Sequence, residues 1–280
     1  MRIHALLMPR LETTLSPVMA ELFDRLGRAG CDVTWSIGEE HAYDPTMLGV
    51  DHDLYLLKSQ ASATLSLAAT LDSLGAMVLN PVVSNQVAQD KVVASARCAA
   101  FGIRTPRTWV SAEPDRLQAI VGPGRLVVKP YNGYHGYGVR FLDHAGQLAE
   151  LPRTDTAVIV QERVAGADDL KVYVIGDDVF GVRKVFDPHS HGRAGVPVTL
   201  SPAVVDVARC CGAAFGFGLY GIDVVETDDG PVVIDVNGFP GYKGVPDAAE
   251  RLCDYILRYA AGAIQLRLPP LARPALTATP

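Results

Sequence analysis

Near the C-terminus the chain reads VVIDVNGFPGYKGV, residues 232–245, and this stretch decides most of what can be inferred about the fold. An apolar strand leads into Asp235 and Asn237, which are two residues apart and therefore lie on one face of the strand. A loop rich in Gly and Pro follows directly. The pattern raises the question of what these polar groups bind.

A second apolar strand, GIDVVE at 221–226, precedes this one, and the turn residues DDG at 228–230 separate the two strands. If these three residues form the loop of an antiparallel hairpin, Asp223 lies directly opposite Asp235. Like charges opposite each other are destabilising, and a divalent cation between them reverses this effect. Two carboxylates and the amide of Asn237 suit Mg²⁺ or Mn²⁺. We therefore expect a metal site here; two solvated strand acids are the alternative.

The stretch LVVKPYNGYHGYGVRFL, residues 126–142, contains a strand that ends at Lys129 and a loop with three glycines. Glycines let backbone N–H groups approach a phosphate closely. The loop joins two strands and no helix follows it, which argues against a Rossmann fingerprint and a P-loop. Lys129 is therefore a candidate phosphate ligand. Lys91, in a helix expected at about 85–101, is a second candidate, although a solvated helix lysine is equally compatible with its position.

A third informative stretch begins with an apolar strand that ends in Gln-Glu-Arg-Val at 161–164, whose backbone could bind an adenine. Cations follow on the next two strands: Lys171 on the first, Arg183 and Lys184 on the second. A three-residue turn at 176–178 would place Lys171 opposite Arg183. Lys184 would then point to the other face unless a bulge intervenes.

The first 80 residues alternate strand and helix signals and predict a small α/β unit with a mostly parallel sheet. Ser16 followed by Pro17 is typical of a helix start. After Gly102 the pattern changes to strands joined by short turns. Helices are expected at 202–215 and at about 246–262.

Composition restricts the partners of this 280-residue chain, which is 49% hydrophobic and 20% charged. The net charge of −6, with no block of Lys and Arg, argues against a nucleic-acid or anionic-membrane partner. The five cysteines are scattered and form no C-x-x-C, as expected of a reduced cytoplasmic protein. We found no signal-peptide pattern and no apolar run of about 20 residues, so we expect cytoplasmic localisation.

Taken in order, these stretches resemble the ATP-grasp superfamily over roughly residues 50–262. The resemblance rests on NPVVSNQVAQDK, VVKP with a G-x-x-G-x-G loop, Q-E-x-V, D-x-K, G-I-D and D-V-N-x-x-P-G. The final motif looks like that of the RimK-type amino-acid ligases. Its F-P-G-Y form, with LLK at 56–58, also looks like the inositol trisphosphate kinase branch.

The resemblance implies an N-terminal α/β domain followed by two α+β subdomains that clamp ATP. We place the N-terminal domain at 1–84, the central subdomain with the glycine-rich loop at 85–165, and the C-terminal subdomain with the metal site at 166–265. A flexible tail is expected at 266–280.

The resemblance also implies roles for individual positions. Nucleotide contacts are implied for Lys91, Lys129, Asn132, Gly133, Gly136, Gly138, Gln161, Glu162, Val164 and Asp169. Asp223, Asp235 and Asn237 would hold Mg²⁺ or Mn²⁺, and Lys171, Arg183 and Lys184 are the candidate catalytic cations. Lys171 stands where RimK-type ligases usually have Arg, and Asp235 stands where those ligases often have Glu.

The function implied is that of a Mg-ATP-dependent carboxylate-amine, or carboxylate-thiol, ligase that forms an acyl phosphate and releases ADP and phosphate. A small-molecule kinase of the inositol-phosphate-kinase type is the alternative, and a non-catalytic nucleotide-binding protein is a further one. The expected acceptor is a small molecule or a peptide. A homodimer is compatible with the sequence.

Overall fold

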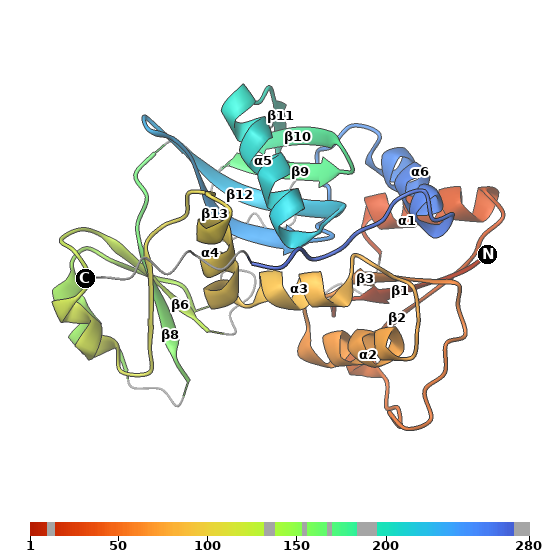
Figure 1. Cartoon of the computed structure of the whole chain (residues 1–280), viewed down its shortest axis with the longest axis horizontal. Helices are drawn as coiled ribbons and strands as arrows, with labels where there is room; N and C mark the ends of the chain where they lie inside the picture. Colours follow the sequence, from red (N-terminus) through yellow and green to blue (C-terminus); the bar gives the residue numbers. More distant parts are fainter. Residues whose placement is uncertain (10–14, 132–137, 153–155, 167–169, 184–194, 272–280) are drawn as a thin grey trace.

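The computed structural model describes residues 1–9, 15–131, 138–152, 156–166, 170–183 and 195–271. Within these residues, three sheets follow one another along the chain (Figure 1). Each sheet falls within one of the three units inferred above, whose boundaries remain a prediction.

The N-terminal sheet is parallel, in the order β2-β1-β3-β4. Its elements are β1 (Arg2–Leu7), α1 (Pro17–Arg28), β2 (Asp32–Ile37), the 3₁₀ turn η1 (Gly38–Glu40), β3 (Leu54–Lys58), α2 (Ser62–Ser73) and β4 (Val78–Leu79). Side chains alternate between the two faces, so that Ile3 and Ala5 pack towards α1 while Leu6 packs towards α2. The carboxyl ends of β1 and β3 lie together, with Leu7 beside Lys58.

The central sheet is antiparallel, in the order β5-β8-β6-β7. Its elements are β5 (Thr108–Ser111), η2 (Pro114–Ala119), β6 (Leu126–Pro130), β7 (Arg140–Leu142), η3 (Ala145–Glu150) and β8 (Val158–Glu162). Leu117 of η2 and Leu148 of η3 bury themselves against Leu126 and Val160. This small core supports the strand ends that carry Lys129 and Gln161. Strand β5 was not among the strands predicted from the sequence.

The C-terminal sheet has the order β11-β10-β9-β12-β13, and its paired strands are antiparallel. Its elements are β9 (Leu170–Ile175), β10 (Asp178–Arg183), β11 (Val196–Val198), α5 (Pro202–Phe215), β12 (Leu219–Thr227), β13 (Gly230–Gly238) and α6 (Ala248–Ala260). Helix α5 covers one face, where Leu170, Val224 and Val233 are buried. Helix α6 packs against α1 of the N-terminal unit.

The helix expected at about 85–101 is in fact two helices, α3 (Val82–Gln89) and α4 (Lys91–Ala100). Asp90 separates them and caps α4, because its Oδ1 accepts hydrogen bonds from the backbone N–H groups of Val92 at 3.0 Å and Val93 at 3.1 Å. Lys91 therefore stands in the first turn of a new helix.

Replacing Asp90 with Ala is expected to lower the free energy of unfolding by about 1 kcal/mol, because two backbone N–H groups lose their acceptor. Urea denaturation of the two proteins measures this difference. Asp24→Ala is the matched control, since Asp24 is an exposed residue inside α1 and caps neither end of that helix. Equal losses in both variants would contradict a capping role for Asp90.

The hairpin of β12 and β13 differs from the sequence prediction in its turn but not in its acid pair. Thr227 pairs with Gly230, so the turn has two residues, and the three-residue loop was wrong. A bulge then intervenes: Val224 pairs with Val233, whereas Asp223 pairs with Asp235. Ile234 is the extra residue. The predicted opposition of Asp223 and Asp235 is confirmed because the bulge restores the register that the shorter turn shifts.

The hairpin of β9 and β10 also has a two-residue turn, since Asp178 pairs with Ile175. No bulge compensates within β9 and β10, so Lys171 pairs with Val182 and Arg183 pairs with Leu170. The predicted opposition of Lys171 and Arg183 was wrong. These two cations stand on opposite faces of the sheet.

No helix among the described residues is both long enough and apolar enough to cross a membrane.

Candidate nucleotide and metal site

A charged row crosses the face of the C-terminal sheet that lies opposite α5. Lys171 of β9, Asp223 of β12 and Asp235 of β13 are successive cross-strand neighbours. Lys171 Nζ lies 2.7 Å from Asp223 Oδ1, and the two side chains are 31% and 30% exposed. The ion pair is thus half-buried, at a place that a ligand can reach. We call Lys171, Asp223 and Asp235 the charged row.

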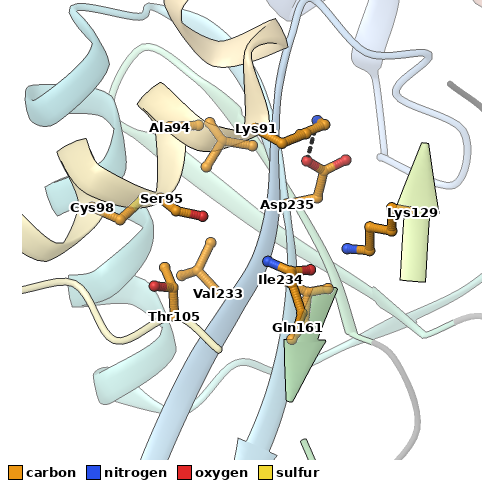
Figure 2. A pocket seen from close by; sticks show the side chains of 11 residues that line it. Lys91, Ala94, Ser95, Cys98, Thr105, Lys129, Gln161, Val233, Ile234 and Asp235 are labelled. Carbon is orange, nitrogen blue, oxygen red and sulfur yellow. Dashed lines mark hydrogen bonds and ion pairs between the residues drawn. The ribbon is translucent and has the colours of Figure 1, made fainter. Parts of the chain in front are cut away.

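Two further lysines reach Asp235 from other parts of the chain. Lys91, at the start of α4, forms an ion pair with Asp235 Oδ1. Lys129 points into the space below Asp235 from the end of β6 (Figure 2), and its charge acts on the same carboxylate. Desolvation by itself would raise the pKa of Asp235, but Lys91, Lys129 and the hydrogen bond from Asn237 together hold that pKa below its usual value. Asp235 is therefore a carboxylate near neutral pH.

Lys171 is protonated for a related reason. Burial by itself would lower the pKa of Lys171, but the charge and hydrogen bond of Asp223 outweigh burial and raise it. Each acid of the row therefore has its own ammonium group, Lys171 for Asp223 and Lys91 for Asp235.

Asn237 belongs to the same face, two residues beyond Asp235 on β13. Its Nδ2 donates to Asp235 Oδ2 at 3.1 Å, and its Oδ1 accepts from Gln60 Nε2 at 3.1 Å. Gln89 Nε2 in turn donates to the backbone oxygen of Gln60 at 2.5 Å. Sequence reasoning missed both glutamines, because Gln60 belongs to no motif and Gln89, although it lies within NPVVSNQVAQDK, carried no role there. They come together only when the N-terminal unit packs against β13.

A pocket lies between α4, β6, β8 and β13, with Lys91, Lys129 and Asp235 at one side (Figure 2). Ala94, Cys98, Val233 and other small or apolar groups line the rest. Burial raises the pKa of the Cys98 thiol to about 11, so this thiol stays protonated at neutral pH and is unsuited to act as a nucleophile. The pocket thus combines cations with a partly apolar wall.

Gln161 lines this pocket, but its side chain is already engaged. It is 5% exposed, and its Nε2 donates to Thr108 Oγ1 of the neighbouring strand β5 at 3.0 Å. The backbone N–H of the adjacent Glu162 donates a hydrogen bond to the backbone oxygen of Arg107 at 3.0 Å. These contacts fix the end of β8, so Gln161 shapes the nucleotide pocket as part of its wall.

Val164 follows β8 and is partly exposed beside Glu162. Gly138 lies just before β7, at the end of the glycine-rich loop, and has a φ of 73°. A Cβ at Gly138 would lie 2.6 Å from Pro130 Cγ, so both the conformation and the space require glycine. Five predicted site residues lie outside the described residues: Asn132, Gly133, Gly136, Asp169 and Lys184.

Arg183 does not share a face with the charged row, so its predicted place opposite Lys171 was wrong. Its role as a catalytic cation stays a prediction. Its strand partner is Leu170, which is buried towards α5. Arg183 Nη2 lies 3.9 Å from Glu226 Oε2, and Glu226 Oε1 accepts from Ser201 Oγ, the N-cap of α5, at 3.3 Å. Because the turn has two residues and not three, the register differs by one from the prediction, and the Arg183 side chain lies on the opposite face from the row.

The donor atoms fit a hard divalent cation. Within the described ranges, no group of three or more His, Cys, Asp and Glu side chains could hold a metal ion by itself. The sheet face opposite α5 instead presents two carboxylates and one amide, from Asp223, Asp235 and Asn237. Such a set leaves coordination positions for phosphate oxygens and water, which is how Mg²⁺ is usually bound beside a nucleotide. The residues therefore fit a metal that arrives with a nucleotide.

The sequence profile of the RimK-like ATP-grasp domain matches residues 88–256, which include the charged row, the pocket and Asn237. The chain belongs to the RimK-like ATP-grasp family. A solved ATP-grasp RimK domain protein from Sphaerobacter thermophilus superposes with a TM-score of 0.74 at 21% identity, over 92% of this chain and 100% of that one. The D-alanine–D-alanine ligase of Bacillus anthracis, solved with ATP, gives a TM-score of 0.70 at 19% identity over 94% and 98%. The ATP-grasp fold expected from the sequence is confirmed.

Two curated relatives of this RimK-like protein are named as ligases. A probable alpha-L-glutamate ligase of Shewanella loihica is 31% identical, over 63% of this chain and 64% of its own length, less than two thirds of either. A ribosomal protein bS6–L-glutamate ligase of Salmonella paratyphi B is also 31% identical, over 70% and 72%. The family thus supports the RimK-like branch over the kinase branch, and it supports an ATP-dependent carboxylate-amine ligase in general terms.

Proposed function

We propose that this protein joins a carboxylate to an amine at the expense of ATP, through an acyl phosphate. The charged row carries the proposal: two opposed carboxylates, each paired with its own lysine, stand beside a pocket with a third cation. The two lysines offset the repulsion between the opposed acids, and the row stands directly beside the pocket. A site for a metal–nucleotide complex accounts for this arrangement.

The reaction needs no side-chain nucleophile. The carboxylate oxygen of one substrate attacks the γ-phosphorus of ATP, and the bond to the β–γ bridging oxygen breaks, which releases ADP and leaves an acyl phosphate. The amine of the second substrate then attacks the acyl carbon, loses a proton, and expels phosphate. Such transfers depend mainly on positioning and on neutralising the charge of the phosphoryl group.

The residues divide these tasks by position. Lys91 and Lys129 line the pocket, where they would contact the phosphates of a bound nucleotide. Lys171 lies across the row, beside Asp223, where it would offset charge on the phosphoryl group as it moves towards the acceptor. Mg²⁺ or Mn²⁺ held by Asp223, Asp235 and Asn237 would neutralise phosphate charge.

The substrates are inferred from the ligase relatives and are an amino acid as the amine and a small carboxylic acid or peptide as the acceptor. A relative named for its action on ribosomal protein bS6 and L-glutamate and a structural neighbour solved with a precursor peptide both support this class. All five cysteines are free, which supports the proposal of a reducing, cytoplasmic setting.

The test is to incubate the protein with Mg-ATP and a panel of amino acids, short peptides and polyols, and to identify products by mass. We expect ADP and phosphate in equal amounts, together with a new amide. ADP with a stable phosphate ester of a polyol would instead indicate a kinase. Nucleotide binding with no turnover of any pair in the panel would favour the non-catalytic alternative.

Replacing Lys171 with Met is expected to lower turnover about tenfold or more, because the moving phosphoryl group loses a cation. Arg183→Met is the matched control, since it removes a cation from the other face of the neighbouring strand. Steady-state kinetics with varied acceptor and varied ATP compares the two variants. An Arg183 variant as impaired as the Lys171 variant would contradict the assignment by face.

A further inference from the structure

The carboxyl end of β3 contacts the backbone that follows the metal residues. Lys58 Nζ donates to the backbone oxygens of Phe239 at 2.9 Å and of Pro240 at 2.7 Å. The same ammonium group lies 4.9 Å from the centroid of the Phe239 ring. One side chain of the N-terminal unit thus holds two consecutive carbonyl groups and one aromatic ring of another unit.

The backbone held by Lys58 adopts conformations that L residues seldom adopt. Phe239 has a φ of 37° and Tyr242 a φ of 50°, and neither is glycine. Such residues persist only when surrounding contacts determine them, and they cluster at functional sites. We call residues 239–242 the aromatic loop. It begins two residues after Asn237.

The aromatic loop has anchors on the C-terminal side as well. Phe239 and Tyr242 are 2% and 1% exposed. The N–H of Phe239 donates to the oxygen of Leu219 at 2.8 Å, and the hydroxyl of Tyr242 donates to the oxygen of Val174 at 2.9 Å. These contacts fix the loop to its own sheet, whereas Lys58 fixes the carbonyl groups of residues 239 and 240 from the opposite side.

We propose that Lys58 is a positioning residue, which holds the aromatic loop and thereby sets the place of Asn237 in the metal site. The proposal rests on the function proposed above. It gives the N-terminal unit a part in metal binding, although no residue of that unit is a ligand. Gln60, two residues further along, also helps to position Asn237, because its side chain donates a hydrogen bond to Asn237 Oδ1.

The alternative for a lysine at this place is direct contact with an anionic acceptor. The geometry favours positioning, because two of the three N–H donors of the ammonium group are already directed at carbonyl oxygens. A lysine that binds a mobile substrate would have to give up these bonds at each turnover. The two roles also differ in what they predict for the protein without substrate.

The test compares Lys58→Met with Lys58→Arg, in which a cation with several donors remains. Arg28→Met is the control, because it removes an exposed cation of the same unit. Hydrogen exchange of peptides covering 238–243 is measured without ligands. Mn²⁺ affinity is measured by calorimetry in the presence of saturating ADP.

In Lys58→Met we expect faster exchange at 238–243 and a dissociation constant for Mn²⁺ raised about tenfold or more, since charge-assisted hydrogen bonds are lost. Lys58→Arg should retain most of the affinity, and Arg28→Met should match the parent protein. Exchange at β1 and β12 should be unchanged in all three variants. A purely structural role would instead speed exchange in those strands, which would overturn the proposal.

Unchanged loop exchange in Lys58→Met would also overturn it, and so would a raised KM for the acceptor with unaltered Mn²⁺ affinity. A parent protein that binds no Mn²⁺ with ADP would refute the proposed function. Hydrogen exchange would still decide whether Lys58 holds the loop, so the two failures are distinguishable.

Discussion

We expect Asp235→Asn to lower ATP turnover by about 100-fold or more and to leave the folded structure intact. The amide has the shape of the carboxylate but lacks its charge. A cation between strands β12 and β13 would lose one of its two anionic ligands, and Lys91 and Lys129 would lose the charge that they share. Formation of ADP with Mg²⁺ measures the effect, and circular dichroism verifies the fold.

Asp229→Asn provides the matched control for this experiment. Asp229 lies in the turn of the same hairpin, and its side chain is 88% exposed. The substitution makes the same chemical change, away from the charged row, and should leave turnover as it is. Near-normal activity of the Asp235 variant at ordinary Mg²⁺ concentrations would show that the metal assignment is wrong.

Lys129→Met is expected to weaken nucleotide binding by about 1.5–3 kcal/mol, the usual contribution of a hydrogen bond to a charged group. That loss corresponds to a dissociation constant raised by a factor between about 10 and 150. Methionine keeps most of the length and the apolar stem of the side chain, so the wall of the pocket is preserved. Calorimetric titration with a non-hydrolysable ATP analogue measures the change.

Arg28→Met again serves as the control, because it lowers the net charge equally on a distant, exposed helix end. It separates the loss of a local phosphate contact from the weaker general attraction of a more negative protein for an anion. If the Lys129 and Arg28 variants bind the analogue equally well, Lys129 is not part of the nucleotide site.

The acid pair could be predicted from sequence because local rules determine it. Two apolar strands joined by a short turn specify an antiparallel hairpin, and the alternation of side chains places Asp235 and Asn237 on one face. The prediction used the wrong turn and reached the right pair, because the bulge at Ile234 moved the register by one residue. A short turn cannot be assigned reliably from Asp and Gly alone, since two-residue and three-residue loops both favour them.

The same uncertainty had the opposite result at β9 and β10. There, no bulge compensated for the shorter turn, and Arg183 was placed on the wrong face. The break at Asp90 was also missed, although an Asp before a helical run is a known N-cap signal. In that case apolar residues continued on both sides of Asp90, and the pattern looked like one helix.

Lys58 and Gln60 could not have been assigned their contacts from the sequence. Their partners, Phe239, Pro240 and Asn237, are about 180 residues away, and the interactions are with backbone oxygens and an amide. Backbone acceptors leave no pattern of residue types, because every residue supplies one. Only the packing of one unit against another reveals such contacts.

The bulge at Ile234 has a consequence for comparing related chains. A hairpin without that residue would pair Val224 with Val233 and Asp223 with the acid in unbroken alternation. The number of residues between the two acids is therefore free to differ by one without separating them. Relatives that lack the extra residue would keep the acids opposed. An alignment that is anchored at the turn and forbids a gap at this point would match their second acid to Ile234.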